Sequence, residues 1–380
     1  MISFELSADQ KRLKGKYHKI AESQLRPMSL ELDKKEPGPI LPNYLKILGR
    51  HSLNSIVIPK DYGGNPVDNI TLAIIEEELA WGSMDFISIA NATFHAVMTI
   101  LIGGSEEQKE KFLPWLLSPR GAVASFCATE DKSGSDSSSY STVVRRKKDR
   151  YILNGTKNPV INAGDSLFYI VWANTENERD RSGINAFIVP ADSEGITIGP
   201  YHDKLGFRGL PTASVSFKDV SIPKSNLIGL QGSGYLLLMQ VVDWGRALTG
   251  ATCVGLVRAV LEEAIEYSKS RLVKNSPIFK KQGVSFILSE IATNLEAARL
   301  LVWSACRLID LGLDHSTASS MAKLFSSELA VRASSEALLI LGQKGCYSPS
   351  LIEKLLRDAQ LTRIIEGTSQ IQKAIIANQF

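Results

Sequence analysis

A single carboxylate near the end of the chain has the surroundings of a general base. Glu366 follows two isoleucines and precedes Gly367-Thr368-Ser369, where the helical pattern breaks and a new helix begins. Ser369 and Gln372 have the spacing of a capping box, which places the break at Gly367–Ser369. Burial against the isoleucines would raise the pKa of Glu366, and the facing helix N-terminus would lower it. Such a carboxylate can remove a proton near neutral pH, although in an isolated motif a residue that merely ends a helix is the commoner case.

The other reactive side chains show no pattern of a metal or thiol site. The five histidines lack metal-ligand spacing, so we predict no bound metal. The four cysteines are far apart and form no Cys-x-x-Cys pair. Together with the absence of a signal peptide, this predicts reduced thiols and a cytoplasmic protein.

Composition excludes several classes of protein. A chain of 380 residues with 44% hydrophobic and 22% charged residues is globular, with two or three domains. The net charge of +3 and the lack of basic runs interleaved with aromatics argue against nucleic acid. Arg145–Lys148 precedes Asp149–Gly155, which is typical of a hairpin turn, so we interpret the basic cluster as a solvated tip. No uncharged apolar run reaches membrane-spanning length, which predicts no membrane association.

The period of the apolar residues divides the chain into three domains. Residues 1–120 have helical spacing, residues 121–232 form short alternating runs separated by turn residues, and residues 233–380 return to helical spacing. The fold class is therefore α+β, with a small β-barrel or sandwich between two helical domains. We predict helices at 41–48, 69–81, 87–102, 234–271, 282–311, 317–341, 351–365 and 369–378. We predict strands at 122–128, 141–144, 151–153, 166–173, 184–190, 196–198 and 213–217.

Nine short motifs occur in one order along nearly the whole chain. They are Pro59–Gly64, Ser105–Pro114, Cys127–Asp136, Asn154–Lys157, Lys204–Arg208, Asp243–Arg246, Glu296–Arg299, Arg357–Ala359 and Ile365–Thr368. Each is weak alone, but in this order and spacing the set is very specific. The chain resembles the acyl-CoA dehydrogenase family.

The resemblance implies a fold and a reaction. The fold has an N-terminal helical domain, a central β-domain and a C-terminal four-helix bundle, assembled as a homodimer or homotetramer. FAD lies between the β-domain and the bundle, with its adenosine half touched by the neighbouring subunit. A glutamate removes the α-proton of an acyl thioester while hydride passes to the flavin, and an electron-transfer partner reoxidises it. Glu366 matches that base, and Gly245, at the position used by some members, carries no carboxylate.

The resemblance also assigns binding residues. Thr129 matches a residue that contacts the flavin. Ser135 matches a residue that lies near both the cofactor and the substrate's pyrophosphate, and Gly367 matches a residue at the substrate. The remaining matches are Asp243 and Arg246 near the pantetheine, Arg271 and Gln282 at the partner's FAD, and Thr368 and Gln370 at the FAD. From spacing alone, Asp243 and Arg246 also fit a helix-surface ion pair.

Several usual flavin contacts are replaced, so two explanations stay open. Pro159 stands where the family has Trp, Ile161 where it has a hydroxyl, and Lys274, Leu339 and Gln343 replace adenosine-side residues. Either FAD binds through the remaining groups, or the protein has lost FAD. A protein without FAD would perform elimination or isomerisation on an acyl thioester, or bind an acyl carrier without catalysis.

The substrate is defined only by class. The phosphopantetheine thioester is common to CoA and to a carrier protein, so either substrate fits, in fatty acid metabolism or in biosynthesis. Phe94 and Met98 are more typical of core residues than of a ligand pocket. If they line the pocket, they shorten it and favour a short- or medium-chain acyl group.

Overall fold

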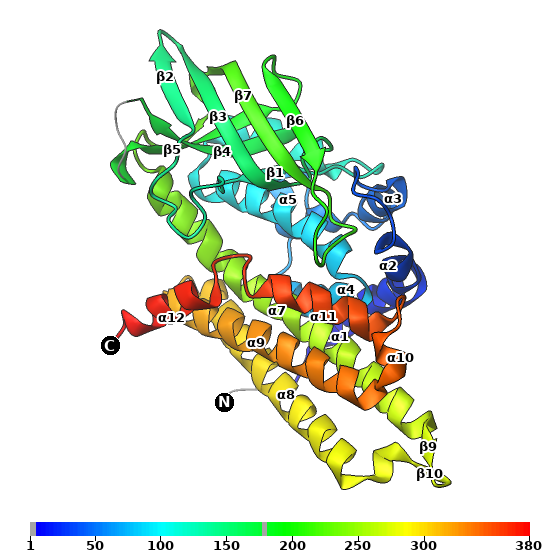
Figure 1. Ribbon diagram of the computed structural model, residues 1–380. Helices are drawn as coiled ribbons and strands as arrows, with labels where there is room; N and C mark the ends of the chain where they lie inside the picture. Colours follow the sequence, from blue (N-terminus) through cyan, green and yellow to red (C-terminus); the bar gives the residue numbers. More distant parts are fainter. Residues whose placement is uncertain (1–4, 177–180) are drawn as a thin grey trace.

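The computed structural model describes residues 5–176 and 181–380, which form helices, then a sheet, then helices (Figure 1). Capping boxes at Ser7 and Ser105 fix the starts of two N-terminal helices. The N-terminal helices are α1 (Ala8–Ile20), α2 (Arg26–Leu32), α3 (Pro42–Arg50), α4 (Asn69–Gly82), α5 (Met84–Gly103) and α6 (Glu106–Phe112).

The central part is a mixed sheet with the order β6-β7-β3-β2-β4-β5-β8, in which β1 pairs with β4. Its inner face buries aromatic and branched side chains, which explains the alternating pattern of the sequence. The strands are β1 (Ser125–Cys127), β2 (Val143–Lys147), β3 (Arg150–Ile161), β4 (Phe168–Thr175), β5 (Ile184–Pro190), β6 (Ile196–Tyr201), β7 (Thr212–Pro223) and β8 (Leu227–Ile228).

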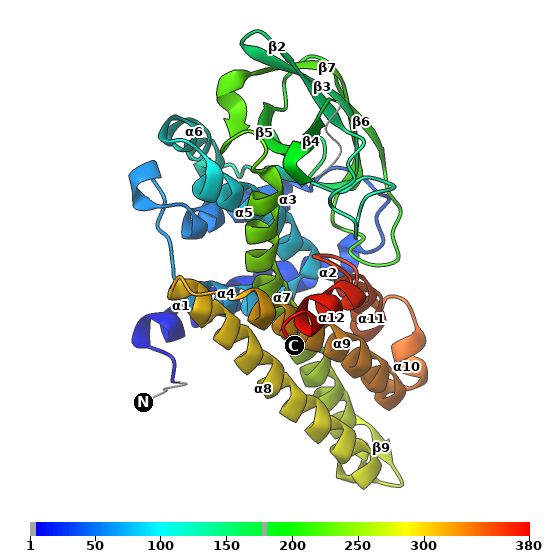
Figure 2. The ribbon, with the colours of Figure 1, turned by 90° about the vertical axis from the view of Figure 1, so that its left-hand side faces the viewer.

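The C-terminal helices pack around one long helix that begins beside the sheet (Figures 1 and 2). This helix, α7, contacts α4, α5, α8, α9 and α11, so it joins the N-terminal helices to the bundle. The C-terminal helices are α7 (Gly234–Ser270), α8 (Gln282–Asp310), α9 (Ser316–Leu341), α10 (Gln343–Cys346), α11 (Leu351–Thr362) and α12 (Ser369–Ala377). The helix–sheet–helix architecture predicted from the periodicity is confirmed.

A buried ion cluster holds the three parts together. Lys354 Nζ on α11 donates to Asp85 Oδ2 at 2.9 Å and to Asp358 Oδ2 at 2.5 Å. Asp358 accepts from the main-chain N–H of Phe207 at 2.7 Å, and Asp85 accepts from that of Gly209 at 3.0 Å. Two of the nine motifs, Lys204–Arg208 and Arg357–Ala359, therefore meet at this cluster, which orients the bundle against the β-domain.

Three sequence expectations are corrected. The hairpin turn lies at Lys148 and Asp149, because Tyr151–Gly155 continues inside β3, and the basic residues before it belong to β2. The last predicted long helix stops at Thr362, before the break. Helix α5 is long and apolar enough to cross a membrane. The expectation that no uncharged apolar run reaches membrane-spanning length was therefore wrong. However, 67% of its apolar window is buried inside the molecule, as in the core helix of a soluble protein.

Candidate active site

The break between α11 and α12 presents Glu366 in a left-handed conformation. Glu366 has φ 53° and Gly367 has φ 86°, and these two residues turn the chain from one helix into the next. The helix cap is Thr368, whose hydroxyl accepts from Ile371 N at 3.3 Å. The prediction of Ser369 as the cap was wrong: its hydroxyl donates to Glu328 Oε1 at 2.6 Å.

Two buried side chains hold the carbonyls of this break. Lys323 Nζ on α9 donates to the Gly367 carbonyl at 2.7 Å. Gln372 Nε2 donates to the Glu366 carbonyl at 2.9 Å and to the Gly367 carbonyl at 3.0 Å. Because a main chain with positive φ is strained for glutamate, these bonds fix the position from which its carboxylate leaves the chain.

Cations surround the Glu366 carboxylate. Burial raises its pKa, but the positive charges of His95, Arg246 and Lys323 outweigh this effect, so the pKa of Glu366 lies below the ordinary value. The sequence analysis expected the helix N-terminus to lower this pKa, whereas the lowering comes from these side-chain cations, and Ile364, expected to bury the carboxylate, is 64% exposed. Glu366 is thus held ionised, as a base must be before it accepts a proton.

His95, which the sequence analysis did not single out, is the group nearest to this carboxylate. Its Nε2 lies 3.4 Å from Glu366 Oε1, and its Nδ1 lies 2.7 Å from the main-chain carbonyl of Asn91. The rings of Phe126 and Trp244 pack edge-on against the His95 imidazole, with ring centroids 5.4 and 5.7 Å from its own. The signal that could have drawn attention to it is the only histidine of a long, strongly apolar helix.

Asp243 and Arg246 form an ion pair on α7, as their spacing predicts. Arg246 is buried, and its charge is one of those that lower the pKa of Glu366. Gly245 lies between them and faces His95. The structure therefore brings Glu366, Gly367 and Arg246 together, with Asp243 held beside them.

The predicted flavin contacts lie at one end of the sheet. Thr129 follows β1, and its carbonyl accepts from Asn158 N at 2.9 Å. The Asn158 side chain is held between Asp131 Oδ1 and His202 Nε2, each at 2.7 Å. The pairing of β3 with β7 shifts register between Lys157 and Val160, so Pro159, which has no N–H to donate, lies in a bulge.

The neighbouring predicted residues contribute main-chain and exposed groups. Ile161 ends β3, and its carbonyl accepts from Ser125 Oγ at 2.7 Å. Ser135 is exposed in the loop after β1, and Gln370 is exposed in the first turn of α12.

The predicted adenosine-side residues lie at the far end of the bundle. An open pocket of about 690 Å³ there is lined by Arg271, Gln343, Lys344, two tyrosines and Gly342. The positive charges of Arg271 and Lys344, the hydroxyls of the two tyrosines and the main chain of Gly342, which has positive φ, suit a phosphate-bearing ligand. These residues therefore fit FAD. Gln282, Lys274 and Leu339 are exposed near the ends of α8, α7 and α9.

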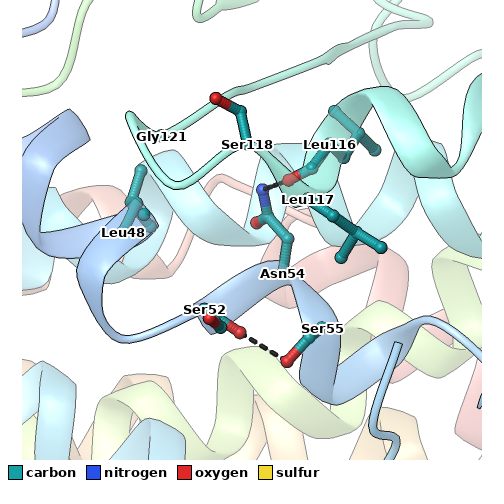
Figure 3. A pocket seen from close by; sticks show the side chains of 9 residues that line it. Leu48, Ser52, Asn54, Ser55, Leu116, Leu117, Ser118 and Gly121 are labelled. Carbon is teal, nitrogen blue, oxygen red and sulfur yellow. Dashed lines mark hydrogen bonds between the residues drawn. The ribbon is translucent and has the colours of Figure 1, made fainter. Parts of the chain in front are cut away.

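A second pocket has a structural role. It holds only about 10 Å³ beside Asn54, whose Nδ2 donates to the carbonyl of Leu116 (Figure 3). The same Nδ2 also donates to the carbonyl of Ala122. The pocket has the room of a single water molecule. None of the predicted site residues lines it.

Comparisons with known proteins give the family. Models of the N-terminal, middle and C-terminal domains of acyl-CoA dehydrogenase match residues 7–120, 125–220 and 232–380. The chain belongs to the acyl-CoA dehydrogenase family. The Bacillus subtilis acyl-CoA dehydrogenase is 35% identical over 98% of each chain, and the human mitochondrial short-chain specific acyl-CoA dehydrogenase is 34% identical over 99% of this chain and 90% of its own.

Solved structures of the family have the same fold. Butyryl-CoA dehydrogenase from Megasphaera elsdenii superposes with a TM-score of 0.95 and 31% identity, covering 100% of this chain and 99% of its own. The prolyl acyl carrier protein oxidase AnaB superposes with a TM-score of 0.91 and 29% identity over 99% of each chain. This acyl-CoA dehydrogenase homologue therefore belongs to the flavin-dependent class of enzymes that oxidise CH–CH bonds, and the solved relative PigA, 26% identical, is a complex with FAD. The alternative of a relative without FAD is not favoured.

Proposed function

We propose that this protein desaturates a short- or medium-chain acyl thioester between Cα and Cβ, with Glu366 as the base that removes the α-proton. The observation that carries the proposal is the Glu366 carboxylate, fixed at a helix break and kept ionised by His95, Arg246 and Lys323. A weakly acidic α-proton requires a close, ionised base and a polarised carbonyl. The main-chain N–H of Glu366 and the adjacent Gly367 supply that second function.

Bound FAD would accept the hydride from Cβ. We assign its flavin and pyrophosphate contacts to Thr129, Ser135, Thr368 and Gln370. Arg271 and Gln282 would hold the adenosine half of the FAD bound to a neighbouring subunit. Pro159 and Ile161 lack the usual ring-stacking and hydroxyl contacts, so the main chain around the β3 bulge takes a larger share of the binding.

The size of the site favours a short acyl group. His95 lies against Glu366, and the rings of Phe126 and Trp244 pack against His95, which leaves bulky side chains on this side of the base. Relatives named for short-chain acyl-CoA and for butyryl-CoA support this size class, whereas a prolyl carrier protein oxidase supports a carrier-bound substrate. Ser135, Asp243 and Arg246 would contact the phosphopantetheine that is common to both.

We infer an oligomer and an electron-transfer partner. Helices α8 and α9 expose large apolar side chains that a homodimer or homotetramer would cover; they are Phe286, Leu300, Met321, Phe325 and Leu339. We also propose that residues 1–120, 121–232 and 233–380 form three domains and that the protein is cytoplasmic.

The visible spectrum of the purified protein tests the proposal. Stoichiometric oxidised flavin should remain after incubation with FAD and desalting. Butyryl-CoA or a butyryl carrier protein should then bleach it anaerobically and yield the trans-2-enoyl thioester. A colourless protein that does not retain FAD, or a flavoprotein that no acyl thioester bleaches, would overturn it.

A further inference from the structure

The hydrogen bonds of His95 fix which of its ring nitrogens carries a hydrogen. Nδ1 lies 2.7 Å from the Asn91 carbonyl, which can only accept, so Nδ1 is an N–H donor. Nε2 is therefore the nitrogen that faces Glu366 Oε1 at 3.4 Å. In a neutral ring, Nε2 would present a lone pair to a carboxylate, and the two would repel. The pair must therefore hold one additional proton.

Because His95 is buried, water cannot take the place of the proton between Nε2 and Glu366. His95 is 5% exposed, and within the described residues its Nε2 makes no hydrogen bond, so the 3.4 Å ionic contact with Glu366 Oε1 is what meets it. A buried nitrogen without a partner destabilises the folded protein. Either an imidazolium faces a carboxylate, or a protonated carboxyl donates to a neutral ring.

The surrounding charges favour the imidazolium and the carboxylate. From α4, Glu76 accepts from Asn91 Nδ2 at 3.3 Å, and burial raises its pKa to about 8, so it carries negative charge less readily than an ordinary carboxylate. From α7, Arg246 faces the site paired with Asp243. From α9, Lys323 faces the site, with its pKa lowered by burial to about 8. The net effect lowers the pKa of Glu366 and raises that of His95.

We propose that His95 and Glu366 act as one unit with a shared proton, in which His95 is the positioning residue of the base. The catalytic meaning of this unit rests on the function proposed above. Its imidazolium aims the carboxylate before substrate binds. When the Cα–H bond breaks, its proton goes to Glu366 and its electron pair becomes the second bond between Cα and Cβ, while the hydride that leaves Cβ would pass to the bound FAD. His95 keeps its own proton, so the unit changes from neutral to +1 and stabilises the negative charge that develops at the thioester carbonyl.

Imidazole NMR of the ¹⁵N-histidine-labelled, FAD-loaded protein tests the shared proton directly. The His95 signals are assigned by their loss in His95→Gln. At pH 7 both ring nitrogens should carry a proton. In Glu366→Gln, Nε2 should become an unprotonated acceptor, and the titration midpoint of His95 should fall by about one pH unit or more. An unchanged midpoint in a Glu366→Gln protein of wild-type melting temperature would overturn the proposal.

The pH profile of desaturation gives a second measurement. Loss of the imidazolium charge in His95→Gln should move the acidic limb of kcat/KM upward by about one unit, because the pKa of Glu366 is no longer held down. His51→Gln, a histidine at the end of α3, should leave the limb in place. If His95→Gln desaturates the substrate and the acidic limb of its profile does not shift, the role of His95 is overturned and the proposed function stands. Absence of desaturation together with a shifted His95 midpoint overturns the proposed function but leaves the shared proton standing.

Discussion

Gly245 lies directly against the imidazole of His95. A Cβ atom on Gly245 would be 2.1 Å from Nε2 and 2.9 Å from the neighbouring Cε1. Among the described residues, the three atoms nearest to that Cβ all belong to His95. The missing side chain on α7 is therefore what allows a histidine on α5 to reach Glu366.

This contact predicts the effect of Gly245→Ala. The methyl group should push the imidazole away from Glu366 and raise the lower limit of the active pH range by about one unit, as the loss of His95 would. Unfolding free energy should fall by about 1–2 kcal/mol, because the crowding of buried His95 and the loss of its contact with Glu366 outweigh the gain from a better helix former. The measurements are kcat/KM against pH and the His95 NMR midpoint.

The matched control for this change is Gly283→Ala on α8. A Cβ there would meet no atom within 4 Å. An unchanged pH profile in Gly245→Ala, equal to that of the control, would show that His95 does not need this space.

Replacement of the base is the most direct test of the site. Glu366→Gln keeps the size of the side chain and removes its ability to accept a proton. Reduction of the bound flavin by acyl thioester should slow by about a hundredfold or more. Rapid-mixing absorbance measures this rate, and FAD content should stay at the wild-type level. The exposed Glu31→Gln on α2 is the control, and a Glu366→Gln enzyme as fast as that control would exclude Glu366 as the base.

The helices could be predicted from the sequence more readily than the site. Helices such as α5 and α8 have a strong period, whereas β3 runs through Gly155 and Pro159, which read as strand breakers. Glu366 could be found from its motif. His95 could be noticed as a histidine in an apolar stretch, but its role could not be assigned, because that role depends on the crossing of α5 and α7 and on a glycine far away in the sequence.

The helix cap shows the same limit on a smaller scale. Thr368 and Ser369 have equal chemical ability to cap α12. The backbone decides between them: Thr368 has the extended conformation of an N-cap, and Ser369 is already helical. The motif alone carries no information about these dihedral angles.

Lys323 predicts a link between stability and catalysis. Lys323→Met should remove the bond to the Gly367 carbonyl and leave only Gln372 Nε2 to satisfy it. We expect a loss of about 1 kcal/mol of unfolding free energy. We also expect a fall in kcat larger than any change in KM, because the break that aims Glu366 loosens. Denaturant unfolding and steady-state kinetics measure the two effects, with the exposed Lys46→Met as control. Unchanged kcat in a folded variant would contradict this role.

Glu130 and Lys157 predict the behaviour of the β-domain in acid. Lys157 Nζ donates to Glu130 Oε1 at 2.8 Å, and the N–H groups of Ser141 and Thr142 donate to the same carboxylate. These bonds hold the pKa of Glu130 down at about 2. Because the folded pKa is below the unfolded value, the stabilisation is present above about pH 4.5 and is lost as the pH falls towards 2.

Glu130→Gln should therefore lower the unfolding free energy at pH 7 by about 3 kcal/mol. Loss of the carboxylate leaves Lys157 buried without its ionic partner. The unfolding free energy of the variant should also fall less steeply between pH 4.5 and pH 2 than that of the wild type. The two proteins should therefore approach equal stability near pH 2. Urea unfolding between pH 2 and 7 measures both effects, and the exposed Glu194→Gln of the same domain is the control. A constant difference between variant and wild type over this range would show that Glu130 is not the titrating group.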